Sequence, residues 1–588
     1  MRSIRIARLK LPLKKVWLRK RTQDGFLPRC NSRSLYNLIT KTVGYFAARL
    51  KESYRFVLAI GFFLVLYGGL GVHLYSLQIE RSIASNANAS TGDLTKNLVR
   101  GVINFTDKNN TLIPAASNKE YPNLAANPEA LAREGRDLKE LSSNIALVLG
   151  TDNADEIYAK ISNPKRQYEE LAKNVPESVV TEIDSWNMKG IYISNDKRRF
   201  YPFGTLASQV LGFVSKEGEG KYGLEAFYDD ELSGKNDVTG VGEDINLTID
   251  PTVQAQSEKI LTNLVTKFKA KEGQVIVMEP KTGKILAMAS TPTYDPNDYG
   301  KSEMANYLNR TVQTTYEPGS VFKIVTVSAG IDSHSFTPST TYYDSGSATI
   351  NGRTIKNWDN KAHGTLTMAE VIEQSINTGT IFMEQQMGGQ TFLGYIKKFG
   401  FDKKLDVAGL PGEVRGDISG LEKNAVPVNF ATASFGHGVS VTPLRMLTAV
   451  NAVANGGIMM KPFIIAGTKE EELGQPITKE SAETVKKIMI SAVDKARIAH
   501  IKNYSVAGKT GTALVPKNGR YTEDVINTYI GFAPASDPKF SILLRMDEPE
   551  GAPLAGQTIV PAFRELAEFL LVYYNVVPDR IENETSAH

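Results

Sequence analysis

The sequence predicts a large α/β domain preceded by a membrane anchor and by a smaller module of mixed α and β structure. Three observations support this prediction. An uncharged apolar run lies near the N-terminus, strand-like runs stand at both ends of residues 241–575, and helical patterns fill the middle of that region. Strands that are distant in the chain can complete one sheet, so we expect the C-terminal strands to join the early ones.

The apolar run from Phe56 to Tyr75 contains no Lys, Arg, Asp or Glu and is long enough to span a bilayer as a helix. Residues 1–55 carry fifteen Lys and Arg but only two acidic residues, which predicts a cytoplasmic basic tail. We therefore expect one transmembrane anchor over 56–76 in the cytoplasmic membrane, with all later residues outside the cytoplasm. The alternatives are a buried core helix and a signal peptide cleaved near 87–89. The apolar run and the basic tail before it are both too long for a signal peptide.

Composition argues against several function classes. The only cysteine is Cys30, and the six histidines lack the His-x-x-His and His-Glu-x-x-His spacings of zinc enzymes. The formal net charge is +4, but the residues after 55 have an excess of nine acidic side chains. A nucleic-acid binder is expected to carry its positive charge on the folded part. We therefore expect no metal, no cofactor and no nucleic-acid partner.

Residues 77–240 predict a pedestal module in which no residue set suggests chemistry. A strand, an Asn-rich turn and a second strand are expected over 101–112. Helical patterns cover 128–184, and another apolar, helix-like run covers 206–214. A spacer or an interaction module is the expected role.

The region 241–575 predicts the α/β domain itself, and the residues after it, 576–588, are expected to form a frayed tail. The expected elements are a strand at 245–250, a helix at 251–268, a hairpin at 274–289, helices within 368–399, a helix at 479–494, strands at 504–507, 527–532 and 540–546, and a helix at 561–574.

The segment Tyr316-Glu317-Pro318-Gly319-Ser320-Val321-Phe322-Lys323 predicts a short loop and then the first turn of a helix. Residues three positions apart share one face of a helix, so the Lys323 amine can reach the Ser320 hydroxyl. Burial favours the neutral form of a lysine amine, and a neutral amine beside a serine can take the hydroxyl proton. Ser320 is therefore a candidate nucleophile with Lys323 as its base.

Spacing alone does not single out this pair. Ser-x-x-Lys also begins at Ser162, Ser194 and Ser536, which we interpret as surface turns, and Lys-Thr-Gly also occurs at 281–283, at a hairpin tip. The informative feature is the order of three motifs within one domain, namely Ser320-x-x-Lys323, Ser375-x-Asn377 and Lys509-Thr510-Gly511-Thr512.

This triple is similar to the motifs of serine penicillin-recognising enzymes, and its surroundings resemble class B penicillin-binding proteins over about residues 100–575. The resembling segments are Arg100-Gly101, Tyr201-Pro202, Gly223-Leu224-Glu225, Leu247–Asp250, Gly283–Ser290, Tyr294–Asn297, Tyr316–Gly319, Phe435–Gly438, Thr442-Pro443, Asn455–Gly457 and Gly531–Pro534. Ile376, Arg445 and Asn109-Asn110 depart from the family's usual residues. The resemblance implies the serine β-lactamase and penicillin-binding transpeptidase fold, an antiparallel sheet flanked by helices.

The resemblance also implies a peptidoglycan D,D-transpeptidase that β-lactams inhibit covalently. Ser320 would attack the penultimate D-Ala carbonyl of a stem peptide and form an acyl-enzyme, while Lys323 takes the hydroxyl proton. Ser375, with Lys509 near it, would pass a proton to the leaving nitrogen. Asn377 would hold the substrate amide and help to position Lys323.

Substrate binding is implied for the third motif. Lys509, Thr510 and Thr512 would bind the terminal carboxylate of the stem peptide by charge and by hydrogen bonds. Gly511 would leave room for the substrate to lie along the strand. The backbone N–H groups of Ser320 and Thr512 would form the oxyanion hole.

The alternatives are a membrane-anchored β-lactamase and a penicillin sensor. The chain has no Glu-x-x-Leu-Asn after Ser375, which a class A hydrolase would use for deacylation, and the basic tail is too small for a signalling domain. The single anchor, basic tail and modest pedestal resemble the division-specific FtsI type, with the elongation-specific type as runner-up. This resemblance implies septal wall synthesis with an FtsW-type SEDS glycosyltransferase and other divisome membrane proteins.

Overall fold

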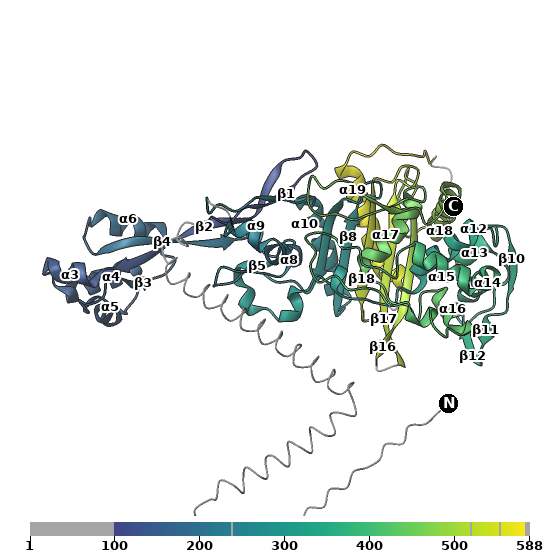
Figure 1. The fold of residues 1–588 in the computed structure, drawn as a ribbon, viewed down its shortest axis with the longest axis horizontal. Coiled ribbons are helices and arrows are strands. Elements are labelled where there is room, and N and C mark those ends of the chain that lie inside the picture. The colour runs from purple at the N-terminus through teal and green to yellow at the C-terminus, as the bar shows by residue number, and fades with distance from the viewer. Residues whose placement is uncertain (1–98, 237–238, 518–519, 552–553, 583–588) are drawn as a thin grey trace, which may run out of the picture. The chain divides into compact units, whose positions relative to one another are not determined.

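A computed structural model of the chain describes residues 99–236, 239–517, 520–551 and 554–582 (Figure 1). The predicted basic tail, the anchor at 56–76 and Cys30 lie outside the described residues. Within the described ranges, no helix is both long enough and apolar enough to cross a membrane.

A five-stranded antiparallel sheet forms the centre of the larger domain, in the order β16-β17-β18-β8-β9. The C-terminal strand β18 pairs with β8, for example Leu544 with Val275. This confirms the expectation that the C-terminal strands complete a sheet begun by the early hairpin. Strand β16 lies at one edge of this sheet. The strands are β8 (Glu272–Met278), β9 (Ile285–Thr291), β16 (Ala507–Lys517), β17 (Arg520–Ala533) and β18 (Phe540–Asp547).

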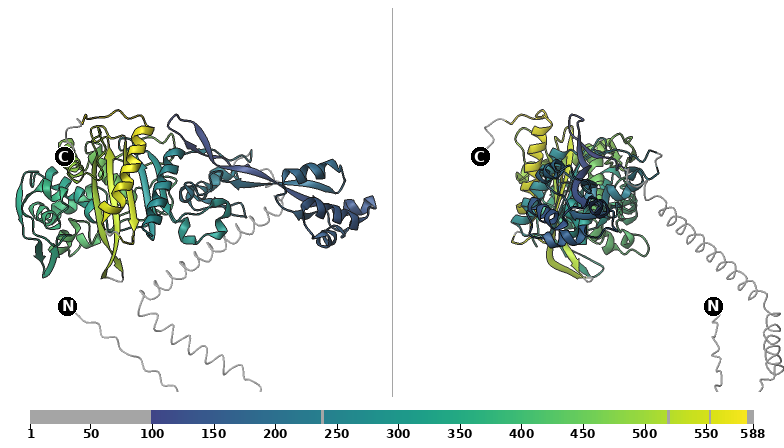
Figure 2. Two further views of the ribbon diagram at one scale, coloured as in Figure 1. Left: turned by 180° about the vertical axis from the view of Figure 1, so that it is seen from behind. Right: turned by 90° about the vertical axis from the view of Figure 1, so that its left-hand side faces the viewer.

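Both faces of this sheet are buried, because apolar side chains occupy alternate positions on both sides of its strands. One face packs on α10 and α19, and Val275, Leu544 and Phe563 share its core cluster. The other face packs on α17 and on the turn that precedes α12, where Leu543 and Phe322 share a second cluster. Figure 2 shows α19, in yellow, lying alongside the strands. These helices are α10 (Pro251–Lys267), α12 (Lys323–Asp332), α17 (Pro443–Ala454) and α19 (Ala555–Tyr573).

Most of the expected helices of this domain are found close to their expected bounds. The helical stretch at 368–399 is broken into three pieces, and a capping box between Thr367 and Glu370 starts the first of them. The helices are α11 (Arg310–Gln313), α13 (Met368–Glu373), α14 (Asn377–Met387), α15 (Gly389–Lys398), α16 (Pro427–Ala433) and α18 (Lys479–Ala496). Short strand pairs are β10 (Thr341–Asp344) with β13 (Gly364–Thr367), β11 (Ser347–Ile350) with β12 (Arg353–Lys356), and β14 (Met459–Met460) with β15 (Glu472–Gly474).

Two expectations near the C-terminus are wrong in their bounds. The strand expected at 504–507 begins at Ala507 and continues through the Lys-Thr-Gly motif, because those residues pair with β17 over its whole length. The last helix begins at Ala555, so Pro561 lies inside it. Ile559 and Val560 are buried against the sheet, and this packing stabilises the helical turns before Pro561.

The tail expected to be frayed is tied to the domain as far as residue 582. The Asp579 carboxylate accepts hydrogen bonds from Ser505 and Ser536, and Arg580 forms a two-bond ion pair with Asp494 at 2.9 and 3.0 Å. These polar contacts hold a segment whose Val577 and Ile581 side chains are exposed and do not anchor it.

The pedestal contains a second five-stranded sheet, in which β4 also pairs with β2. The expected strand, turn and strand at 101–112 are confirmed, whereas the strand expected at 245–250 shortens to β7 because Asp250 caps α10. The apolar run at 206–214 forms only one helical turn, and the stretch at 128–184 divides into four helices and a strand. The strands are β1 (Ile103–Thr106), β2 (Leu112–Ala126), β3 (Glu169–Ala172), β4 (Ile191–Phe200), β5 (Phe213–Val214), β6 (Gly220–Lys221) and β7 (Ile245–Asn246), and the helices are α3 (Pro128–Glu134), α4 (Leu138–Leu149), α5 (Ala154–Ile161), α6 (Glu177–Ser185), α7 (Ser208–Leu211), α8 (Gly223–Phe227) and α9 (Asp229–Ser233).

A buried ion network holds the pedestal together. The Glu225 carboxylate is fully buried and accepts hydrogen bonds from Arg100 at 2.7 Å, Arg199 at 2.6 Å and the Tyr201 hydroxyl at 3.2 Å. Arg100 also bonds Asp229 at 2.7 Å. The segments around Arg100, Tyr201 and Glu225, which are separate in the sequence, therefore meet at one carboxylate.

We expect Glu225→Ala to destabilise the pedestal by about 3–5 kcal/mol, because it leaves two buried guanidinium groups without their shared partner. The measurement is the denaturant midpoint for proteolysis within the pedestal. Glu219→Ala is the matched control, since this exposed carboxylate pairs only with exposed Lys221, and its cost should stay below about 1 kcal/mol. Equal midpoints for the two variants would contradict the assigned role of Glu225.

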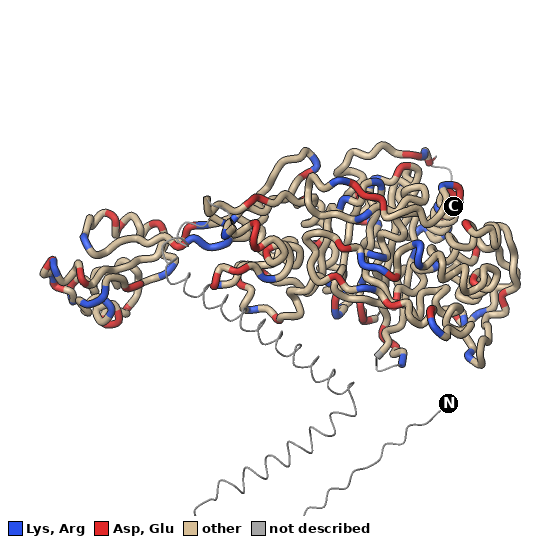
Figure 3. The backbone as a smooth tube through the Cα atoms, viewed as in Figure 1, with Lys and Arg blue, Asp and Glu red and all other residues tan. Residues whose placement is uncertain are grey.

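Basic and acidic residues are interspersed along the backbone of the described part of the chain (Figure 3). Many form local pairs, such as Lys397 with Glu422 and Arg564 with Glu568. Such mixing produces no extended field of one sign over the described part of the chain.

Candidate active site

Ser320 lies on a single tight turn, η4 (Gly319–Phe322), which leads directly into α12. Val321 and Phe322 are fully buried and fix the turn, while Ser320 itself is only half-buried. Gly319 has φ +57°, and a Cβ atom there would lie 3.0 Å from the Cβ of Ala513 on strand β16. Glycine therefore allows the turn to approach the edge of the sheet closely.

Lys323 is completely buried at the start of α12, three residues after Ser320. Its Nζ lies 2.7 Å from the Ser375 carbonyl oxygen and 2.8 Å from Asn377 Oδ1. Burial and the charge of Lys509 hold the pKa of Lys323 well below its ordinary value. A neutral amine has two N–H groups and one lone pair, so these two contacts can use both N–H groups and leave the lone pair for a proton.

Ser375 and Asn377 lie where the chain passes from α13 to α14. Ser375 adopts a left-handed backbone conformation, φ +59°, which brings its carbonyl and its hydroxyl toward Lys323. The Asn377 Nδ2 group donates to the Lys356 carbonyl at 3.0 Å, which orients Oδ1 toward the Lys323 amine. The Ser375 Oγ atom lies 3.4 Å from Lys323 Nζ and 2.9 Å from Lys509 Nζ, and it connects the two lysines.

Lys509 is buried on the edge strand β16, with 4% of its surface exposed. Burial lowers its pKa to about 7. Its Nζ also donates to the Thr510 carbonyl at 3.2 Å, which shows that this carbonyl points away from β17 and toward the site. A small cavity of about 70 Å³ adjoins Lys509 and Thr510 beside α18 and α19.

The backbone of Thr512 faces the nucleophile turn. A Cβ on Gly319 would lie 3.3 Å from the Thr512 carbonyl oxygen. In an antiparallel ladder the N–H and C=O of one residue point to the same side, so the Thr512 N–H also faces the turn. The Thr512 hydroxyl instead donates to Asn527 Oδ1 at 3.1 Å and accepts from the Ala555 N–H at 3.3 Å.

Gly511 has a packing role in addition to the room it was expected to leave for a substrate. A Cβ there would lie 3.0 Å from the Pro318 carbonyl oxygen and 3.1 Å from a Val321 methyl group. The glycine therefore lets β16 pack against the turn that carries Ser320.

A buried cation supports the loop before Ser320 from behind. The Arg545 guanidinium lies 4.3 Å from the centre of the Tyr316 ring and pairs with Asp547. Arg545 stands on β18, in the middle of the sheet, so it joins the nucleophile loop to the centre of the domain.

Glu317, His437 and Tyr521 lie beside the site, but the sequence motifs assign them no role. Glu317 and His437 do lie in the resembling segments Tyr316–Gly319 and Phe435–Gly438. The Glu317 carboxylate accepts hydrogen bonds from the Gly438 N–H at 3.0 Å and from the Tyr521 hydroxyl at 3.0 Å. The rings of His437 and Tyr521 lie 5.3 Å apart. Burial and the charge of Lys323 lower the pKa of His437 to about 4, so this imidazole is neutral.

The other Ser-x-x-Lys pairs lie elsewhere. Ser162 and Ser536 are in surface turns, as expected, but Ser194 lies within strand β4, where pairing with Asn123 of β2 extends the backbone. The second Lys-Thr-Gly forms the turn between β8 and β9, and Gly283 there has φ +88°. No group of His, Cys, Asp or Glu among the described residues could hold a metal ion.

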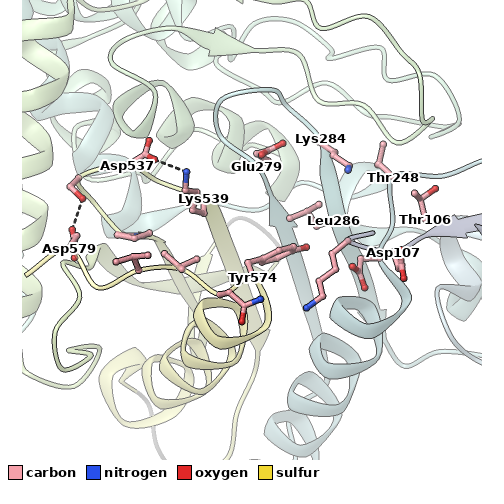
Figure 4. A pocket seen from close by; sticks show the side chains of 17 residues that line it. Thr106, Asp107, Thr248, Glu279, Lys284, Leu286, Asp537, Lys539, Tyr574 and Asp579 are labelled. Carbon is pink, nitrogen blue, oxygen red and sulfur yellow. Dashed lines mark hydrogen bonds and ion pairs between the residues drawn. The ribbon is translucent and has the colours of Figure 1, made fainter. Parts of the chain in front are cut away.

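A separate cavity of about 530 Å³ lies between the β1–β2 turn and the segment after α19 (Figure 4). Its carboxylates already have partners: Asp250 caps α10, Asp537 pairs with Lys539, and Asp579 accepts from Ser536. No residue of the Ser320 cluster lines this cavity. We interpret it as a joint between pedestal and sheet rather than as the reactive site.

Comparisons with known proteins agree with this geometry. Residues 273–568 match the penicillin binding protein transpeptidase domain, and residues 97–265 match the penicillin-binding protein dimerisation domain. Stage V sporulation protein D of Bacillus subtilis is 34% identical over 76% of this chain and 74% of that protein. Peptidoglycan D,D-transpeptidase FtsI of Escherichia coli is 30% identical over 73% of this chain and 76% of that protein. The crystal structure of penicillin binding protein 2X from Streptococcus thermophilus shares the fold, with a TM-score of 0.69 at 24% identity over 81% of this chain and 79% of that chain.

Proposed function

Because this chain belongs to the class B penicillin-binding proteins and is a peptidoglycan D,D-transpeptidase, we propose that it cross-links stem peptides through a Ser320 acyl-enzyme during septal wall synthesis. The observation that carries the chemical part is the meeting of three sequence motifs around one hydroxyl. The Lys323 amine contacts the Ser375 carbonyl oxygen and Asn377 Oδ1, and the Lys509 amine contacts the Ser375 hydroxyl, all within 2.9 Å, beside the turn that bears Ser320.

In the first half-reaction the Ser320 Oγ atom bonds to the carbonyl carbon of the penultimate D-Ala, and its proton moves to the Lys323 lone pair. The carbonyl oxygen becomes an oxyanion that the N–H groups of Ser320 and Thr512 stabilise. The bond to the terminal D-Ala nitrogen then breaks, and that nitrogen takes the proton that passes from Lys323 through the Ser375 hydroxyl. Lys509, protonated, binds the terminal carboxylate together with Thr510 and Thr512.

In the second half-reaction a neutral amine of another stem peptide attacks the Ser320 ester. A new amide bond forms, and the amine gives up one proton through Ser375 to Lys323. The bond from the carbonyl carbon to Ser320 Oγ breaks, and Ser320 recovers its proton from Lys323, which regenerates the free enzyme.

The Thr512 hydroxyl requires one adjustment in this scheme. It is bonded to Asn527 and to the Ala555 N–H, so it must rotate before it can donate to a substrate carboxylate. Rotation about a single side-chain torsion suffices, because threonine side chains have alternative staggered positions.

The cell-biological role is proposed from resemblance. The relationship to FtsI of Escherichia coli supports septal synthesis, while the relationship to stage V sporulation protein D favours a sporulation role as the second candidate. We also propose the arrangement that accompanies the septal role: a cytoplasmic tail at 1–55, an anchor at 56–76, a pedestal at 77–240 and a transpeptidase domain at 241–575. The proposed partner is an FtsW-type SEDS glycosyltransferase, bound through anchor and pedestal.

Depletion of the protein in its host is expected to produce long filaments without septa, because septal cross-linking stops while side-wall growth continues. Fluorescence microscopy with a membrane dye measures cell length and septum frequency. Rounded cells would contradict the septal role and favour the elongation-specific type. Normal vegetative division with defective spores would instead favour the sporulation role.

A further inference from the structure

Among the residues that the structure describes, Glu317 is a half-buried carboxylate with neutral hydrogen-bond partners. It accepts from the Gly438 N–H and from the Tyr521 hydroxyl. Among the residues whose side chains the structure describes, no lysine or arginine forms an ion pair with Glu317. Burial raises the pKa of this carboxyl above its ordinary value. A partly desolvated carboxylate without a cation is an unfavourable arrangement that a positively charged ligand would relieve.

The carboxylate lies at the opening of the Ser320 site. Glu317 is three residues before Ser320, and the intervening Gly319 donates its N–H to the Gly436 carbonyl at 3.1 Å. Gly438, two residues later on that same segment, donates to the carboxylate, and this contact is exposed to solvent. His437 between them is close enough to Lys323 for that charge to lower its pKa, and as a neutral ring it offers Glu317 no positive charge.

The direction of a bound substrate places one particular group near Glu317. A stem peptide held by its terminal carboxylate at Lys509 and Thr510, with its reacting carbonyl beside the Thr512 N–H, must continue along β16 toward Pro516. Pro516 pairs with Tyr521 across the hairpin, and Tyr521 bonds Glu317. The residue that precedes the two D-alanines therefore passes this end of the cleft.

We propose that Glu317, with Tyr521 holding its carboxylate, forms a subsite for a primary ammonium group, namely the side-chain amine of the diamino acid that precedes D-Ala-D-Ala in the donor stem peptide. This inference rests on the proposed function and names the part of the donor that the enzyme selects. The Glu317 Oε1 atom accepts from the Gly438 N–H, whereas among the described residues Oε2 accepts from the Tyr521 hydroxyl alone and so has capacity for a further donor. An N–H⁺···O⁻ contact there would be a charge-assisted hydrogen bond.

The test compares two depsipeptide donors that end in L-Lys-D-Ala-D-lactate, one with a free lysine side-chain amine and one with that amine acetylated. Release of D-lactate gives kcat/KM for each donor. We expect the wild-type protein to favour the free amine by about fivefold to tenfold, mainly through KM, and Glu317→Gln to bring this ratio close to one. Glutamine keeps the shape and one acceptor oxygen but removes the charge.

The ratio of kcat/KM between the two donors distinguishes a binding subsite from general damage to the enzyme. A misfolded or misplaced Ser320 loop would lower kcat/KM equally for both donors and leave their ratio unchanged. Such an unchanged ratio in Glu317→Gln would overturn the inference. Glu317→Asp retains the charge and should keep part of the preference. Glu422→Gln is the matched control, since that carboxylate already pairs with Lys397, and it should keep the full wild-type ratio.

A second arm asks whether the ammonium belongs to the acceptor instead. The enzyme is given the acetylated donor and increasing Nα-acetyl-lysine, and partition to the amide product is measured. If Glu317→Gln raised the KM of this acceptor while the donor ratio stayed unchanged, the donor assignment would be wrong. If wild-type protein used neither donor and no penicillin labelled it, the proposed function itself would fail, which is a distinguishable result.

Discussion

Ser320→Ala is expected to abolish covalent labelling by a fluorescent penicillin, because Ser320 is the proposed nucleophile, on the turn that leads directly to the buried Lys323. A β-lactam stays bound only through an ester with the nucleophile, so the loss should be complete rather than partial. The alanine variant keeps the turn, because Val321 and Phe322 carry its packing. The assay is in-gel fluorescence after denaturation, which removes every molecule that is not covalently attached.

The chain supplies a matched control for this variant. Ser162 begins another Ser-x-x-Lys sequence, but it lies in an exposed turn of the pedestal. Ser162→Ala should therefore label as strongly as wild type. Labelling that persists in Ser320→Ala, or that disappears in Ser162→Ala, would overturn the assignment of the nucleophile.

Sequence patterns predicted this fold where local signals were strong. The Asp250-Pro251 helix start, the β8–β9 hairpin and α18 all carry caps, turns or amphipathic periodicity that act within a few residues. The C-terminal strands were harder, because the strand through Lys509 has glycine and polar residues that give no apolar alternation. Its extended form comes from pairing with β17, a contact that the local sequence does not encode.

The site shows the same division between local and distant information. The three motifs predict Ser320, Lys323 and Lys509 as site residues, and each motif can be found in the sequence because it is itself local. The left-handed conformation of Ser375 could not be predicted, since it depends on how α13 and α14 pack. The contact between Glu317 and Tyr521 joins residues 204 positions apart, so only the folded chain brings them together.

Lys323→Arg is expected to lower the rate of acylation by penicillin by about 10³-fold, although arginine preserves the positive charge. The reason is the protonation state. A base must be neutral to take the Ser320 proton, and a guanidinium keeps its proton throughout the accessible pH range. General-base catalysis typically contributes about 10²- to 10⁴-fold, and loss of the base forfeits that contribution. Stopped-flow or gel-based acylation kinetics give the rate, and Lys281→Arg in the other Lys-Thr-Gly turn should react like wild type.

The pH dependence of wild-type acylation follows from the two buried lysines. Activity should rise with pH as Lys323 loses its proton, and burial together with the charge of Lys509 places that rise well below the ordinary lysine value. Lys509 must stay protonated to bind the substrate carboxylate, and its pKa is about 7, so activity should fall again above about pH 7. Lys509→Arg fixes this second charge, so its profile should lose the alkaline fall and keep the acid rise. An alkaline fall that survives in Lys509→Arg would show that another group controls the alkaline limb of the profile. For the other variant, Lys323→Arg acylation within about tenfold of the wild-type rate would contradict the role of Lys323 as the base.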